Sequence, residues 1–231
     1  MFGRRSILTG CVARPESMRS PRVLPDRRLS TPTWEVIVAR ALILLRVKLP
    51  MAQSSPPKVS KRRMPAQAKL RRIRLFATDV DGVLTDGGMY YSDSGHQMKK
   101  FNVWDGMGLA LMRQAGLILG IITTEKTKLV AQRAKKLQIT EVHQGVWDKL
   151  GVLKALGKRY GVTLQEMAFI GDDINDIEAL QAVGFSASPA DGRQEIRKSV
   201  HYVCKAKGGE GAVRELADMI LAARSKGGHP W

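Results

Sequence analysis

The distribution of hydrophobic positions changes at about residue 73. Before it, prolines interrupt the apolar stretches; after it, short apolar runs alternate with segments of helical spacing. Ile73–Thr78 and Leu117–Thr123 are apolar runs typical of strands covered on both faces. Strands alternating with helices predict an α/β fold, a parallel sheet covered by helices on both faces. The other predicted strands are 141–144, 167–170, 184–187 and 201–204, and the predicted helices are 105–114, 126–137, 147–160, 175–183, 193–198 and 211–223.

A β-hairpin is expected between the first strand and the first helix. Residues 88–91 and 97–102 have strand-like composition and flank a Ser92–Gly95 turn. The whole chain is therefore divided into a basic, proline-rich, disordered leader (1–72), one folded domain (73–223) and a short flexible tail (224–231).

Polar side chains follow the ends of several predicted strands. Asp79 and Asp81 follow the first strand, Thr123 ends the next, Lys149 lies near the start of a helix, and Gly171–Asp176 follows a later strand. Right-handed crossovers place the carboxyl ends of parallel strands at one edge of the sheet, where ligands bind. Carboxylates gathered there repel one another unless a cation lies among them. Oxygen ligands without His or Cys favour Mg²⁺ over Zn²⁺.

A Mg²⁺ ion beside a lysine and a hydroxyl group forms a site for a phosphoryl group. Asp79 could attack phosphorus and form a covalent intermediate, and Asp81 could protonate the leaving oxygen and then activate water. Each of these residues alone also fits an ordinary solvated turn, cap or surface charge. Their occurrence together at strand ends favours the functional interpretation.

The net charge of +17 at first suggests a nucleic-acid-binding protein. However, residues 75–231 carry 20 basic and 18 acidic side chains, so the excess charge belongs to the leader. An Arg-rich, acid-poor leader resembles an organelle transit peptide. We prefer a simpler hypothesis, that the leader is untranslated and that Met51 or Met64 is the true start. A nucleic-acid-binding arm is the third alternative.

Membrane and disulfide-rich classes are not supported. The leader's apolar patch, Val36–Val47, contains two arginines and is shorter than the roughly 20 residues of a membrane-spanning helix. Cys11 and Cys204 are the only cysteines, too few for a disulfide framework or a CxxC metal site. We therefore expect a cytoplasmic protein with neither membrane nor nucleic acid as a partner.

Four motifs together resemble those of the haloacid dehalogenase (HAD) superfamily of phosphatases. They are Asp79-Val80-Asp81-Gly82-Val83, Ile121-Ile122-Thr123, Asp148-Lys149 and Gly171-Asp172-Asp173-Ile174-Asn175-Asp176. Supporting runs at 84–87, 100–106, 144–145 and 207–215 make the chain most similar to small members that act on 3-deoxy-D-manno-octulosonate (KDO) 8-phosphate. The resemblance covers about residues 73–223. It implies a Rossmann-like sheet with the hairpin in place of a cap domain. The residues between Asp86 and the far strand of the hairpin are too few to form a cap domain, which agrees with this implication.

The resemblance also implies roles for individual residues. Asp79 would be the nucleophile and a Mg²⁺ ligand, and Asp81 the acid/base and a Mg²⁺ ligand through its backbone carbonyl. Thr123 and Lys149 would hold the phosphoryl group, and Asp172 would be the third protein ligand of the metal.

Further from the metal, Asp173 and Asp176 are expected to support Asp172 and Lys149. The family's hairpin packs into a homotetramer, in which a neighbouring subunit closes the site. Its glycine-rich tail, here Gly208–Glu215 with Arg214, reaches a neighbouring active site. An alternative for Arg214 is an ordinary surface charge.

The chain departs from the KDO 8-phosphate pattern at residues 123–126. Thr-Gly-Arg-Lys is usual there, whereas this chain has Thr123, Thr124, Glu125 and Lys126. Relatives that prefer 2-keto-3-deoxynononic acid (KDN) 9-phosphate have a glutamate at this place and a lysine eleven residues on, matched here by Lys136. Eleven residues are close to three helical turns, so Glu125 and Lys136 are predicted on one helical face, contacting the substrate together with Thr124. The alternative is a surface ion pair.

We therefore expect a Mg²⁺-dependent phosphatase of a sugar-acid phosphate, with KDO 8-phosphate or the nine-carbon KDN or sialic acid 9-phosphate as substrate. Phosphoryl transfer to a sugar, as in mutases, is a second possibility. Non-enzymatic alternatives are an ancillary subunit of a sugar-acid cytidylyltransferase and a nucleic-acid-binding protein acting through the leader. A P-loop kinase is excluded because the Gly-x-x-x-x-Gly-Lys loop is absent.

Overall fold

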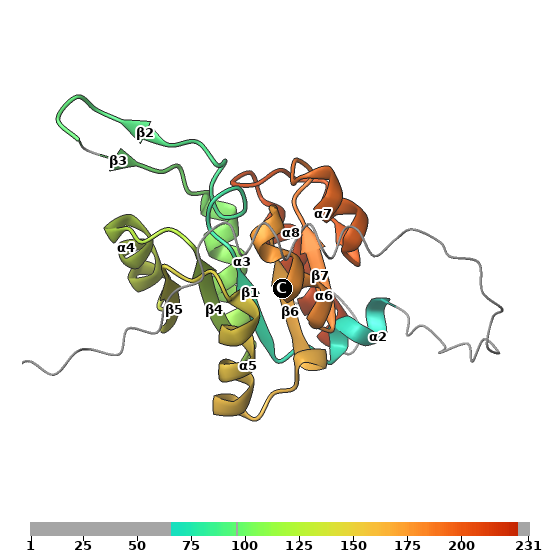
Figure 1. Cartoon of the computed structure of the whole chain (residues 1–231). Coiled ribbons are helices and arrows are strands. Elements are labelled where there is room, and N and C mark those ends of the chain that lie inside the picture. The colour runs from blue at the N-terminus through green and yellow to red at the C-terminus, as the bar shows by residue number, and fades with distance from the viewer. Residues whose placement is uncertain (1–65, 96, 226–231) are drawn as a thin grey trace, which may run out of the picture. The chain divides into compact units, whose positions relative to one another are not determined.

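The computed structural model describes residues 66–95 and 97–225. Their strands form a six-stranded parallel sheet in the order β5-β4-β1-β6-β7-β8. Strand β1, the first of the described strands, therefore lies between β4 and β6 in the middle of the sheet (Figure 1). This confirms the predicted α/β fold. The strands are β1 (Leu75–Thr78), β4 (Ile118–Thr123), β5 (Glu141–Gln144), β6 (Met167–Ile170), β7 (Phe185–Ser188) and β8 (Tyr202–Val203).

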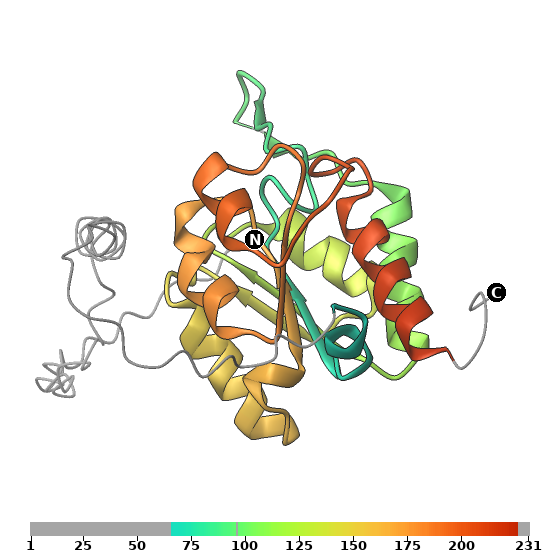
Figure 2. The ribbon, with the colours of Figure 1, turned by 90° about the vertical axis from the view of Figure 1, so that its right-hand side faces the viewer.

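Helices cover both faces of the sheet (Figure 2). Side chains of α2 (Ala66–Arg71), α3 (Val103–Gln114), α4 (Lys128–Leu137) and α8 (Ala212–Arg224) contribute to the core on one face. The core on the other face includes α5 (Lys149–Tyr160), α6 (Ile177–Ala182) and α7 (Gln194–Ser199). Strand β1 serves both cores, because Phe76 packs on the first and Leu75 and Ala77 on the second. This two-sided burial explains the continuous apolar runs.

The predicted β-hairpin is present, with a short paired region. Strands β2 (Tyr90–Tyr91) and β3 (Gln97–Met98) are antiparallel, with Tyr90 opposite Met98. The hairpin projects away from the helices and the sheet (Figure 1). Its apolar side chains are exposed, Tyr91 by 62% and Met98 by 65%. In the described residues this hairpin is the only element between β1 and α3, and no cap domain is present there.

Side-chain caps shift several helix starts from the predicted positions. Helix α3 begins at Val103 because Asn102 accepts a hydrogen bond from Trp104 N–H, so Asp105 is not the predicted cap but lies buried in the first turn. Helix α4 begins at Lys128, behind the cap Thr127. The segment predicted as one helix from residue 175 starts with a 3₁₀ turn, η2 (Ile174–Asp176), before α6.

The described domain extends beyond the predicted limits at both ends. Helix α2 lies inside the segment assigned to the leader, and its Leu70 is a core residue. Arg224, assigned to the tail, ends α8 and donates a hydrogen bond to the Ile73 carbonyl. The predictions on residues 1–65 and 226–231, Cys11 included, lie outside the described residues. Within the described part of the chain, every helix is too short or too polar to cross a membrane.

Candidate active site

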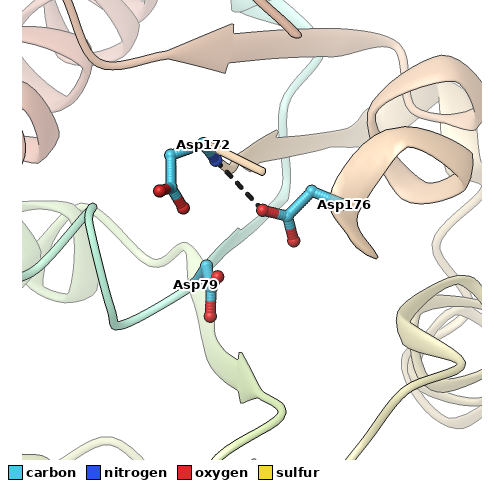
Figure 3. A group of neighbouring side chains, drawn as sticks. All are labelled: Asp79, Asp172 and Asp176. Atoms are coloured by element: carbon cyan, nitrogen blue, oxygen red, sulfur yellow. Dashed lines mark hydrogen bonds between the residues drawn. The ribbon is translucent and has the colours of Figure 1, made fainter. Parts of the chain in front are cut away.

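Three aspartates meet at the carboxyl edge of the sheet. One oxygen each from Asp79, Asp172 and Asp176 lies within 4.8 Å of the others. Asp79 follows β1, Asp172 follows the neighbouring strand β6, and Asp176 ends η2 (Figure 3). Adjacent strand ends thus bring together groups that are 97 residues apart in the chain, as the sequence predicts.

Local backbone geometry allows this close approach. The backbone N–H of Asp79 donates to the Ile170 carbonyl (3.1 Å) and so extends the pairing of β1 with β6 beyond the strands. Gly82 has a φ of +78°, and a Cβ at this position would overlap the Asp172 carboxylate. A side chain at residue 82 would therefore push Asp172 away from Asp79.

Lys149 is the buried cation of this cluster. Its ammonium lies 2.9 Å from Asp79 Oδ2 and 2.5 Å from Asp176 Oδ1, and its side chain is fully buried. Burial alone would lower the pKa of Lys149, but the attraction of Asp176 and Asp79 outweighs it and holds this pKa above its ordinary value. Lys149 is the first residue of α5, whose cap is the neighbouring Asp148. The ammonium therefore stays protonated against the carboxylates.

The electrostatics of the cluster favour a cation. Burial, followed by repulsion from Asp176, raises the pKa of Asp79 to about 7. Burial and the repulsion of Asp176, Asp79 and Asp173 raise the pKa of Asp172 to about 8. The single positive charge of Lys149 therefore does not neutralise the negative charges of these carboxylates at neutral pH.

The donor set fits a divalent metal ion. Asp172 Oδ1 is buried and has no hydrogen-bond partner, as expected for an oxygen that faces a cation. Both oxygens of Asp176 are already used, Oδ1 by Lys149 and Oδ2 by the backbone N–H groups of Asp172 and Asp173. Carboxylate ligands without nitrogen or sulfur suit Mg²⁺. Asp176 therefore holds the loop and the lysine. Its role in supporting metal ligands stays a prediction.

The neighbouring predicted residues line the same edge. Thr123 is the buried last residue of β4. Thr124 Oγ1 accepts a hydrogen bond from Asn175 Nδ2 (3.4 Å), a contact that a glycine could not make. Asp173 caps η2 through Ile174 N–H and pairs with Arg193 (3.5 Å), so its carboxylate shapes the loop and does not contact Lys149.

The prediction that Glu125 and Lys136 share a helical face is wrong. Glu125 precedes α4, which the cap at Thr127 starts at Lys128, whereas Lys136 lies exposed in its last turn. The ammonium that contacts Glu125 belongs to Lys99, at the base of the hairpin, which also lies 2.5 Å from Asp81 Oδ1.

The glycine-rich segment packs on the loop after β1. A Cβ at Gly208 would overlap the Gly82 carbonyl, and Gly209 N–H donates to the Val83 carbonyl (2.9 Å). Arg214 lies at the start of α8, where its Nε pairs with Asp218 (2.8 Å) and its backbone N–H donates to Asp105. The predicted reach of Arg214 into a neighbouring subunit stays a prediction.

Sequence reasoning missed two residues near the cluster, Lys99 and Asn175. Asn175 lies inside the Gly171–Asp176 motif, but the sequence predicts no role for it. Its Nδ2 donates to Thr124, and its buried Oδ1 has no hydrogen-bond partner. Lys99 lies in the predicted hairpin, 18 residues from Asp81 and 26 residues from Glu125. No helical or strand periodicity relates residues so far apart. Only the fold brings these three residues together.

Comparison with known proteins agrees with this architecture. Residues 120–216 match the haloacid dehalogenase-like hydrolase family model. The KDO 8-phosphate phosphatase of Yersinia pestis is 40% identical over 154 residues, covering 67% of this chain and 82% of the relative. That of Escherichia coli K12 is 38% identical over 159 residues, covering 69% and 85%.

Solved structures give the same result. The KDO 8-phosphate phosphatase of Moraxella catarrhalis, in complex with magnesium, phosphate and KDO, is 42% identical with a TM-score of 0.67, covering 68% of this chain and 91% of that one. The cobalt-bound enzyme of Haemophilus influenzae is 36% identical with a TM-score of 0.65 over the same shares. The chain is a haloacid dehalogenase-like hydrolase and belongs to the KDO 8-phosphate phosphatase family.

Proposed function

We propose that this chain is a Mg²⁺-dependent phosphatase that hydrolyses KDO 8-phosphate to KDO and inorganic phosphate. The observation that carries the proposal is the buried cluster in which Lys149 joins Asp79 and Asp176 beside the unpartnered oxygen of Asp172. The relatives described above, one of them bound to magnesium, phosphate and KDO, support both the reaction and the substrate.

The metal would be held by the side chains of Asp79 and Asp172 and by the backbone carbonyl of Asp81. Bound there, Mg²⁺ supplies positive charge that neutralises the phosphoryl oxygens during transfer. Lys149 and the hydroxyl of Thr123 bind the same phosphoryl group from the protein side. Asp176 keeps Lys149 in place through its 2.5 Å contact.

Two steps, each with its own proton transfer, complete the reaction. A carboxylate oxygen of Asp79 attacks phosphorus, and the ester bond to the sugar breaks while Asp81 gives its proton to the leaving oxygen. The product is an aspartyl phosphate and the free sugar acid. Asp81 then takes a proton from water, whose oxygen attacks phosphorus and releases inorganic phosphate, restoring the Asp79 carboxylate.

The eight-carbon acid is the better-supported substrate. The relatives that are about 40% identical to this chain are named as phosphatases of the eight-carbon acid, KDO 8-phosphate. The argument for the nine-carbon acid depended on a Glu125–Lys136 pair, whereas Glu125 contacts Lys99. Measuring kcat/KM on KDO 8-phosphate and on KDN 9-phosphate tests the choice; a preference for the nine-carbon acid would contradict it.

We also propose that copies of the chain assemble through the hairpin into a homotetramer. The supporting observation is a run of exposed apolar side chains on and beside the hairpin. Contiguous exposed apolar patches are typical of protein–protein interfaces. The exposed side chains are Met89, Tyr90, Tyr91, Met98, Val103, Trp104 and Met107, all at least 45% exposed.

The central experiment is phosphate release from KDO 8-phosphate with Mg²⁺ or with excess EDTA, using Asp79→Asn as the control. We expect turnover only with Mg²⁺, and a loss of at least about 10⁴-fold in Asp79→Asn, since that variant has no nucleophile. Near-wild-type turnover in Asp79→Asn would contradict the covalent mechanism.

A further inference from the structure

A second lysine contacts the site from outside the sheet. Lys99 directly follows β3 at the base of the hairpin. Its ammonium lies 2.5 Å from Asp81 Oδ1 and also donates a hydrogen bond to Glu125 Oε2. Only 1% of its side chain is exposed. Three segments that are remote in sequence, namely the loop after β1, the loop after β4 and the hairpin, thus meet at one ammonium group.

The charges explain why the lysine is needed there. The side chains of Asp81 and Glu125 are 34% and 32% exposed, and both contact the same cation. Two carboxylates that contact the same group repel each other. The attraction of each carboxylate to the ammonium between them outweighs this repulsion. Without Lys99 the two carboxylates would move apart, and the side chain of each would be free to take another rotamer.

We propose that Lys99 is a positioning residue that clamps the side chains of Asp81 and Glu125 together, so that the acid/base group and Glu125, which we expect to contact the substrate, keep one fixed arrangement. The inference rests on the proposed function. It adds a role for the hairpin, which contributes a side chain to its own subunit's site. It also means that Glu125 already contacts a cation before a sugar acid binds.

The neighbouring lysine makes a simpler ion pair, with a single carboxylate. Lys100 has 54% of its side chain exposed and lies 3.6 Å from Asp86. Such a pair contributes at most about 1 kcal/mol to stability. Lys99 instead is almost fully covered and bonded to two carboxylates. Lys100→Met is therefore a matched control for Lys99→Met, with the same chemical change one residue along the chain.

The test uses two substrates that differ in their need for Asp81 as the acid of the first step, whereas both need it as the base of the second step. The alkoxide that leaves from KDO 8-phosphate needs a proton, whereas p-nitrophenolate leaves from p-nitrophenyl phosphate without one. We expect Lys99→Met to lower kcat/KM, which reports the steps up to the aspartyl phosphate, by about 10- to 100-fold on KDO 8-phosphate and by less than about 3-fold on p-nitrophenyl phosphate. The first loss stays at or below the low end of general acid catalysis, roughly 10²-fold, because Asp81 itself remains. Lys99→Arg should recover at least about 5-fold of the loss, because guanidinium also joins two carboxylates.

The Glu125 half of the clamp has its own measurement. Glu125→Gln and Lys99→Met should each raise KM for KDO 8-phosphate. The double variant should raise KM no further than the worse single variant, because both changes break one contact. The melting temperatures of all these variants and of Lys100→Met should stay within about 2 °C of wild type. Lys100→Met should keep wild-type kcat and KM on both substrates.

Several outcomes would overturn the clamp. They are an equal loss of kcat/KM on both substrates, no recovery in Lys99→Arg, additive effects in the double variant, or a Lys99→Met enzyme with wild-type kcat/KM on KDO 8-phosphate. If the wild type turns over KDO 8-phosphate and Asp79→Asn does not, any of these results rejects the clamp alone. A wild type without Mg²⁺-dependent turnover of KDO 8-phosphate overturns the proposed function and the clamp with it.

Discussion

Two lysines in this protein each join two carboxylates, one inside the domain and one at its hairpin. Lys149 is fully buried at the start of α5, between Asp79 and Asp176. Lys99 lies at the base of the hairpin, between Asp81 and Glu125, whose side chains are about one third exposed. The chemistry of the two groups is the same, and their surroundings differ.

The difference shows how burial divides the tasks of similar ion pairs. Removing one partner of a buried pair leaves uncompensated charges in a low dielectric and costs about 3–5 kcal/mol, whereas exposed pairs contribute at most about 1 kcal/mol. We therefore expect the Lys149 group to determine both stability and chemistry. The Lys99 group should influence only orientation, since water stabilises its carboxylates when the lysine is removed.

The largest effect is expected from Lys149→Met. With Asp79 and Asp176 buried and unpaired, the free energy of unfolding in EDTA should fall by about 3–5 kcal/mol. Turnover of KDO 8-phosphate should fall at least about 10³-fold. Denaturant unfolding and a phosphate-release assay measure the two effects. Lys154→Met, an exposed change on the same helix, is the control and should be neutral. A Lys149→Met protein as stable as that control would contradict the claim that the Lys149 group, unlike the Lys99 group, determines stability.

The next effect concerns pH in the metal-free protein. Burial and repulsion raise the pKa of Asp79 to about 7 and of Asp172 to about 8, from an ordinary 3.8. The unfolded chain releases these protons at lower pH than the folded one, so stability falls as pH rises from about 4 to about 8. Between pH 5 and pH 8 we expect the melting temperature in EDTA to drop by at least about 4 °C.

Two comparisons isolate this pH dependence. Saturating Mg²⁺ should reduce the drop, because it binds the deprotonated carboxylates. Asp172→Asn should also reduce it in EDTA, since one of the two titrating groups is gone. A drop that is the same in wild type and Asp172→Asn would contradict the raised pKa of Asp172.

A smaller effect on stability is expected from the exposed face of the hairpin. The pair of changes Tyr91→Ser and Met98→Ser should alter the free energy of unfolding of the domain by no more than about 0.5 kcal/mol, since both side chains contact water. It should nevertheless lower the molecular mass in light scattering from a tetramer towards a monomer. Asp93→Ala in the same hairpin should leave the mass unchanged, and an unchanged mass in the double variant would reject this assembly surface.

The smallest effect is expected from removing residues 1–63. All residues that we place at the site lie between 79 and 214, and the described core begins at Leu70. The shortened chain, starting at Met64, should therefore match the full chain in melting temperature and in kcat/KM. Loss of activity on shortening would show that the leader contributes to function.

Much of this site can be predicted because its groups lie at recognisable places in the chain. Apolar runs show where strands end, and parallel topology brings those ends together, so Asp79, Lys149 and Asp172 can be grouped without coordinates. Helix starts were less predictable. Caps at Asn102 and Thr127 decide them, and moving the start of α4 to Lys128 separates Glu125 from the helix that carries Lys136.

The sequence by itself determined the fold class, the acidic edge of the sheet and the resemblance that underlies the proposed reaction, because each depends on periodicity or on motifs within a few residues. Only the tertiary structure decided that Asp176 has both oxygens engaged, that Asn175 meets Thr124 and that Lys99 bridges Asp81 and Glu125. Such contacts depend on how loops and a hairpin lie over the sheet edge. No local pattern encodes a distance between side chains that are remote in the chain and share no periodic element.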